Sequence, residues 1–89
     1  MTVCEVAWTP TASRSVQHLP EKVAAAAVEF IYGPLVESPL RVGKPLRFEL
    51  EGLHVARRGD YRVIYETKDE DHRIVIHAIH HRANAYRRR

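Results

Sequence analysis

Residues 53–67 read LHVARRGDYRVIYET, and they contain two extended runs separated by Gly59-Asp60. The second run is rich in Tyr, Val and Ile, which favour strands. Glycine in the first position of a two-residue loop is typical of a type II′ β-hairpin, because glycine adopts positive φ angles without strain. We therefore predict a hairpin with strands over 53–58 and 61–67.

A two-residue turn also fixes which side chains share a face of the hairpin. The predicted opposite pairs are Arg58 with Tyr61, Arg57 with Arg62, Val55 with Ile64, and His54 with Tyr65. One face then carries Leu53, Val55, Arg57, Arg62, Ile64 and Glu66, and the other carries His54, Ala56, Arg58, Tyr61, Val63 and Tyr65. Since the second face presents two tyrosines and a valine, we expect helices to cover it and the first face to stay open.

Arg57 and Arg62 are thus expected to lie directly opposite each other at exposed positions. Like charges in such a pair repel, so a sheet selected only for stability would more often place opposite charges there. An anion bound between the arginines would turn the repulsion into attraction. The alternative is that each arginine is solvated or pairs with a neighbour such as Glu66.

Upstream of the hairpin, the pattern predicts a strand over 2–8 and then two helices. Thr9 can cap the first helix and Pro10 suits its first position, and the apolar spacing continues through His18. The second helix opens at Pro20 and reaches at least Tyr32. Gly33-Pro34 should weaken or kink it, and Ser38-Pro39 should end the helical region.

The remaining runs predict an antiparallel meander. Residues 46–50 alternate as a strand, the polar residues 68–71 form a turn, and residues 73–81 form a last strand rich in Ile and Val. The order is an N-terminal strand, two helices and then the meander, so we expect one α+β domain over residues 1–89 with the helices packed on one sheet face.

The charges of the 89 residues sum to +3, but their distribution is uneven. No acidic residue follows Asp71, whereas that segment holds five arginines and four histidines: Arg73, Arg82, Arg87, Arg88, Arg89, His72, His77, His80 and His81. A polyanion is the natural partner of such a surface, although a solubilising basic tail would have the same composition.

We expect no membrane contact and a cytoplasmic location, since Cys4 is the only cysteine and no leader or membrane span stands out.

The histidines of the last strand do not predict a metal site. Strict alternation places His80 and Arg82 on one face and His77 and His81 on the other. Four residues of strand separate His77 from His81 by about 13 Å, too far to chelate one ion. We expect neither a metal nor another cofactor.

Two strings resemble RelE-type toxins of the RelE/ParE superfamily. Residues 52–66, GLHVARRGDYRVIYE, resemble the central hairpin of these toxins, and residues 80–87, HHRANAYR, resemble their C-terminal motif. The helix start at Leu19-Pro20 and the segment 43–46 match as well. The resemblance implies a fold like microbial ribonucleases, a RelB-like antitoxin in a hetero-oligomeric complex, and cleavage of mRNA in the ribosomal A site, which would inhibit translation and arrest growth.

The motifs also imply site residues. Four residues correspond to family positions involved in RNA cleavage: Arg57, Arg62, Arg82 and Tyr86. Leu53 and Val55 stand where well-studied members carry two lysines.

Metal-free cleavage by the RNA 2′-hydroxyl needs a proton acceptor, charge stabilisation and a proton donor. Arginine supplies only the second, and tyrosine can stack on a base or donate a proton. The candidates for RNA contacts are His54, His80, His81, Arg87 and Arg88, and any of these three histidines could transfer a proton.

Two other functions fit parts of the sequence. A ParE-like toxin would act on DNA gyrase, but the arginine and tyrosine pattern at Arg82 and Tyr86 favours RNA cleavage. A non-catalytic RNA-binding module is the second alternative, which the lack of lysines at 53 and 55 permits.

Overall fold

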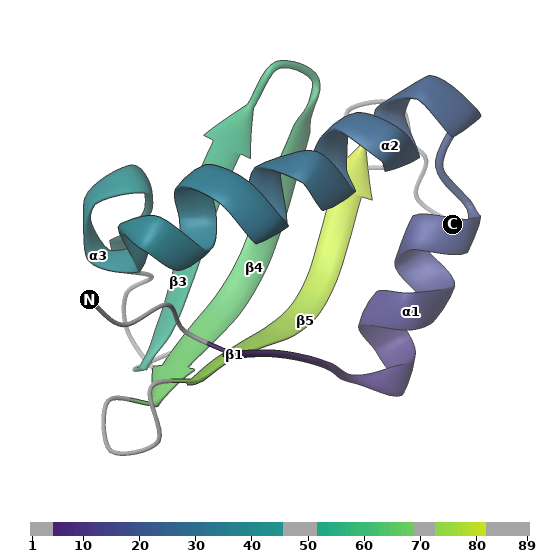
Figure 1. The fold of residues 1–89 in the computed structure, drawn as a ribbon. Coiled ribbons are helices and arrows are strands. Elements are labelled where there is room, and N and C mark those ends of the chain that lie inside the picture. The colour runs from purple at the N-terminus through teal and green to yellow at the C-terminus, as the bar shows by residue number, and fades with distance from the viewer. Residues whose placement is uncertain (1–4, 46–51, 69–72, 82–89) are drawn as a thin grey trace.

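The computed structural model describes residues 5–45, 52–68 and 73–81. Its elements, in chain order, are β1 (Glu5–Trp8), α1 (Pro10–Gln17), α2 (Glu21–Phe30), the π-helical turn η1 (Ile31–Leu35), α3 (Pro39–Val42), β2 (Lys44–Pro45), β3 (Leu53–Arg58), β4 (Tyr61–Lys68) and β5 (Arg73–His81). The strands form one sheet in the order β1-β5-β4-β3-β2. α1 and α2 lie across the same face of this sheet (Figure 1), which confirms the α+β prediction.

The N-terminal strand joins the far end of the meander. β1 pairs in parallel with β5, from Glu5 opposite Arg73 to Trp8 opposite Ile76. All other neighbouring strands are antiparallel. The sequence predicted the strand but not its partner, because a parallel pairing needs a long crossover that leaves no local signal. The predicted strand at 46–50 and most of the turn at 68–71 lie outside the described residues.

α1 begins as predicted. Thr9 is its N-cap, and the Thr9 hydroxyl accepts a hydrogen bond from the Ala12 amide at 3.0 Å. Pro10 occupies the first turn, where the missing amide hydrogen costs nothing because no intrahelical acceptor is available. The helix ends at Gln17, one residue short of the predicted end at His18.

The proline in the second helical segment widens the helix instead of stopping it. Pro34 lies inside η1 and has no amide hydrogen to donate. The chain stays helical across it because the wider π turn has a different hydrogen-bond pattern from an α-helix. The prediction that Ser38-Pro39 ends the helical region is wrong by one turn. Ser38 leaves the helical conformation, but α3 starts at Pro39, whose fixed φ angle suits a first helical position.

The core lies between the helices and the sheet. Its largest fully buried side chains are Tyr65, Ile31, Leu35, Ile74, Ile76 and Val63. The Tyr65 hydroxyl donates a hydrogen bond to the Pro39 carbonyl at 2.5 Å, which ties β4 to α3. A Cβ atom at Gly43 would overlap this hydroxyl, so the close approach requires glycine. Burial raises the pKa of Tyr65 to about 12.

The central hairpin has the predicted register in full. Arg58 lies opposite Tyr61, Arg57 opposite Arg62, Val55 opposite Ile64 and His54 opposite Tyr65. Gly59 has φ +58°, as a primed two-residue turn requires. The face with Ala56, Tyr61, Val63 and Tyr65 is the buried one, so the assignment of the helices to that face is confirmed. Within the described part of the chain, no helix is long and apolar enough to cross a bilayer.

Candidate nucleic-acid interface

Three basic side chains lie next to one another across the open face of the sheet. Arg57 on β3 is opposite Arg62 on β4, and Arg62 is in turn opposite His80 on β5. All three are exposed. Since neighbouring strands are about 4.8 Å apart, the three form a short line, which we call the basic row.

The arginines of the basic row have no carboxylate partner among the described ion pairs. Glu66, the neighbour that could have neutralised them, instead lies 3.4 Å from the Lys68 ammonium and 3.1 Å from Nε2 of His77. The hydrogen bond with His77 is the main cause that lowers the pKa of the Glu66 carboxyl; burial opposes it, and the charge of Lys68 and its hydrogen bond lower the pKa further. The positive charge of Arg57 and Arg62 is therefore available to an anion from solution.

A β-bulge at His77 determines which histidine joins the basic row. Ile64 lies opposite Ala78 but Tyr65 lies opposite Ile76, so β5 has one extra residue at this point. Downstream of the bulge the alternation is reversed. His80 consequently faces the same side as Arg62.

The bulge corrects one prediction. We expected His77 and His81 to share a face opposite that of His80, but strict alternation fails where one residue is left unpaired. His77 contacts Glu66 on the open face, whereas His81 lies opposite Tyr61, whose hydroxyl reaches the Ala26 carbonyl of α2. The grouping of His77 with His81 is therefore wrong.

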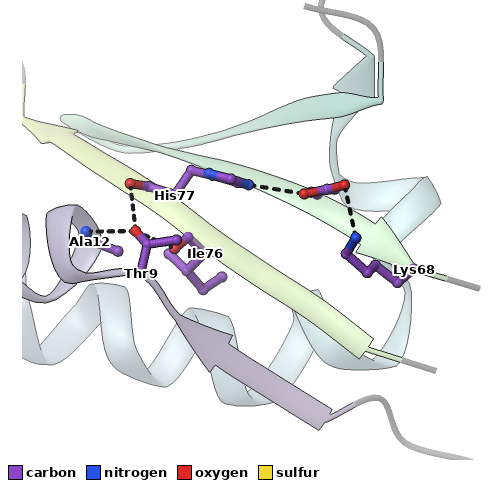
Figure 2. Close-up of polar contacts among 6 residues, drawn as sticks. Thr9, Ala12, Lys68, Ile76 and His77 are labelled. Atoms are coloured by element: carbon purple, nitrogen blue, oxygen red, sulfur yellow. Dashed lines mark hydrogen bonds and ion pairs between the residues drawn. The ribbon is translucent and has the colours of Figure 1, made fainter. Parts of the chain in front are cut away.

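Contacts on both sides of β5 fix the bulge (Figure 2). The Thr9 hydroxyl lies 3.2 Å from the carbonyl oxygens of both Ile76 and His77, and it shares its one proton between them. The Thr9 amide donates a further hydrogen bond to the Ile76 carbonyl at 3.1 Å. On the other side, the His77 ring binds Glu66. The start of α1 thus holds the backbone irregularity that orients His80.

Two of the predicted site histidines lie away from the basic row. His54 is on the helix-covered face, where its ring stacks on Tyr65 with the centroids 5.5 Å apart and the planes at 24°. Its Nδ1 is buried without a hydrogen-bond partner. His81 is half-buried on the same helix-covered face. Arg82, Tyr86, Arg87 and Arg88 lie outside the described residues.

Arg58, the neighbour of Arg57, has a different environment. Its guanidinium lies 5.0 Å from the centroid of the Phe30 ring, on the helix side of the sheet. It lines a surface pocket with Tyr61, whose hydroxyl donates to the Ala26 carbonyl at 3.2 Å. Burial raises the pKa of Tyr61, and the charge of Arg58 partly offsets this rise. Arg58 therefore packs against α2 and is separated from the basic row by the sheet.

Beside the basic row lies an aliphatic surface. It consists of four half-buried residues on the open face: Leu53, Val55, Ile64 and Ala78. Lys44 on β2 is opposite Val55, so it adds an exposed cation that sequence reasoning did not single out. Only the pairing of β2 with β3 reveals that Lys44 belongs to this face. Among the described residues, no group of three or more His, Cys, Asp or Glu side chains could hold a metal ion.

The chain is similar to known proteins over most of its length. A family model described as the ParE toxin of the parDE type II toxin–antitoxin system matches residues 6–86. The Mycobacterium tuberculosis proteins Toxin RelE and Toxin RelG are 60% and 52% identical to it, over 92% and 93% of this chain and 84% and 95% of their own lengths. A chain of the M. tuberculosis RelBE2 toxin–antitoxin complex superposes with a TM-score of 0.90 at 49% identity, covering 93% of this chain and 95% of that one. The isolated Escherichia coli RelE toxin gives a TM-score of 0.72 at 15% identity, covering 88% and 83%.

Proposed function

This chain belongs to the ParE toxin family of type II toxin–antitoxin systems as a toxin of the RelE type, and from that premise we propose that it cleaves mRNA in the ribosomal A site. In this proposal the protein is a metal-independent endoribonuclease of the cytoplasm. Free of its antitoxin, it stops translation and arrests growth.

The observation that carries the proposal is the cross-strand pair of Arg57 and Arg62. Both side chains are exposed, they lie directly opposite each other, and Glu66 is engaged elsewhere. Two adjacent guanidinium groups are costly in a sheet unless an anion binds between them, and guanidinium matches the geometry of phosphate oxygens. A phosphodiester group on the open face accounts for both residues.

The chemistry of the basic row fits RNA better than DNA. In RNA the 2′-hydroxyl can attack the adjacent phosphate, and the protein then has to stabilise the extra negative charge of the phosphorane. Arg57 and Arg62 are suited to this role, since arginine keeps its charge throughout the reaction. Arg82 and Tyr86 are proposed to complete the site, and Lys44 with the proposed contacts from Arg87 and Arg88 would extend the basic surface along the RNA.

A RelB-like antitoxin is the proposed partner. The similar chain from M. tuberculosis belongs to a toxin–antitoxin complex, and an archaeal RelE–RelB complex from Pyrococcus horikoshii matches with a TM-score of 0.63 at 26% identity. An open sheet face with an arginine pair suits an acidic segment that orders on binding. We propose that the antitoxin neutralises the toxin by covering this face.

The test is cleavage of a defined mRNA by the purified protein on programmed ribosomes. We expect a cut at the A-site codon, a fragment ending in a 2′,3′-cyclic phosphate, and full activity in excess chelator as long as the ribosomes stay intact. Intact mRNA at a toxin concentration that stops translation would contradict the proposal. Activity that returned only with an added divalent metal would contradict the metal-free mechanism.

A second candidate function is inhibition of DNA gyrase, because the matching family model is described as the ParE toxin. A gyrase inhibitor would block DNA supercoiling by purified gyrase while leaving mRNA intact. A non-catalytic RNA-binding module would retain mRNA without producing new ends. The same preparation, assayed for supercoiling, RNA binding and RNA cleavage, separates the three functions.

A further inference from the structure

We propose that His80 is the catalytic base of the RNA cleavage reaction, the group that takes the proton from the attacking 2′-hydroxyl. This inference rests on the proposed function and goes beyond it by assigning the proton acceptor. Of the three histidines that the sequence left open, only His80 lies in the basic row, opposite Arg62. His54 and His81 belong to the helix-covered face.

Several other described residues on the open face are poor candidates for the base. Arginine cannot accept a proton near neutral pH because it is already protonated. Leu53 and Val55, at the positions where family members carry lysines, have no group that could exchange one. Glu66 is four residues along β4 from Arg62, about 13 Å away at ~3.3 Å per residue, and it is held by Lys68 and His77.

The surroundings of His80 leave its ring open to a substrate. The charged group that faces it from β4 is Arg62. β1 pairs only with residues 73–76 of β5, so its Glu5 lies at the other end of the strand. α1, which contains Arg14 and is followed by His18, packs on the opposite side of the sheet (Figure 1). Asp60 is in the hairpin turn, and a carboxylate is ordinarily a weaker base than imidazole.

The reaction balances without a cofactor. A ring nitrogen of neutral His80 accepts the 2′-hydroxyl proton, and the electron pair of that O–H bond forms the new bond from the 2′-oxygen to phosphorus. The bond from phosphorus to the 5′-oxygen breaks, and its electron pair stays on the 5′-oxygen, which takes a proton from water. The imidazolium then returns its proton to the solvent. The products are a 2′,3′-cyclic phosphate and a 5′-hydroxyl, and nothing is oxidised or reduced.

The experiment compares single-turnover cleavage on programmed ribosomes for wild type, His80→Gln, His77→Gln and Arg62→Ala, from about pH 5.5 to about pH 8.5, a range that spans the usual titration of imidazole. His77→Gln is the matched control, because His77 lies on the same strand and face and a glutamine amide can still bind Glu66. We expect wild type and His77→Gln to lose rate as the pH falls. His80→Gln should be slower by about 10²-fold or more and should lose this acid limb. Imidazole added to His80→Ala should restore cleavage, which a purely structural role would not allow.

The outcomes separate the two proposals. If wild type cuts no mRNA at any pH, the proposed function fails. If wild type cuts and Arg62→Ala does not, but His80→Gln retains both the rate and the acid limb, the function stands and the assignment of the base is wrong. Circular dichroism of each variant checks that the substitutions leave the fold intact.

Discussion

Arg62 on β4 lies directly opposite His80 on β5, and the two side chains share the open face because β5 contains a bulge at His77. Without the extra residue, His80 would face the helices and His81 would take its place. A histidine beside an arginine pair is therefore a consequence of one backbone irregularity. The stability of the bulge therefore determines whether His80 stays beside Arg62.

We predict that Thr9→Ala destabilises the protein and slows RNA cleavage. The substitution removes the cap of α1 and the hydroxyl shared by the Ile76 and His77 carbonyls. Loss of an N-cap alone costs about 0.5–2 kcal/mol in the free energy of unfolding, which urea denaturation measures. Thr9→Ser keeps the hydroxyl and should behave like wild type. A Thr9→Ala protein within about 0.3 kcal/mol of wild type would show that the cap does not hold this region.

We predict that Glu66 contributes to stability in a pH-dependent way. The contact with His77 lowers the Glu66 pKa from its usual 4.5, so the folded protein favours the ionised carboxylate. The contribution is present above about pH 4.5 and is lost as the pH falls through the lowered pKa. Denaturation of wild type and Glu66→Gln at several pH values should therefore give a difference at pH 7 that shrinks towards pH 3. A constant difference across this range would argue against a stabilising contact of the Glu66 carboxylate with His77.

We predict an alkaline limb of stability that depends on Tyr65. Burial raises the Tyr65 pKa to about 12 from 10.0, so the folded state retains a proton that the unfolded state releases first. This contribution is complete below pH 10 and is lost as the pH rises towards 12. Tyr65→Phe removes the titrating hydroxyl together with the bond to the Pro39 carbonyl. It should be less stable at pH 7 and should lack the part of the alkaline limb that Tyr65 causes; an unchanged limb would assign it to other groups.

The hairpin was predictable in full because a two-residue turn fixes register locally. Gly59-Asp60 determined every pair from Arg58 with Tyr61 to His54 with Tyr65, and with them the exposed arginine pair. The helix start at Thr9 was equally local, since a cap and a following proline are adjacent in the sequence.

The remaining features depend on contacts between distant segments. The bulge at His77 has no glycine or proline to mark it, and Thr9, 68 residues away, helps to hold it. The parallel pairing of β1 with β5 and the place of Lys44 on the open face follow from sheet order. The structure was therefore needed to show which of the three histidines lies beside Arg62. The position of Arg57 opposite Arg62 was predictable from the sequence alone.

The measurement that tests the central claim most directly compares Arg62→Ala with Arg58→Ala for growth arrest and mRNA cleavage. Arg62 lies in the basic row, whereas Arg58 packs over Phe30 on the other side of the sheet. We expect Arg62→Ala to melt normally, but to lose growth arrest and about 10²- to 10³-fold in cleavage rate, as when one transition-state donor is removed. Arg58→Ala should lose about 0.5–1 kcal/mol of stability with its cation–π contact and remain toxic. A fully toxic Arg62→Ala beside a folded but inactive Arg58→Ala would place the active site on the opposite face.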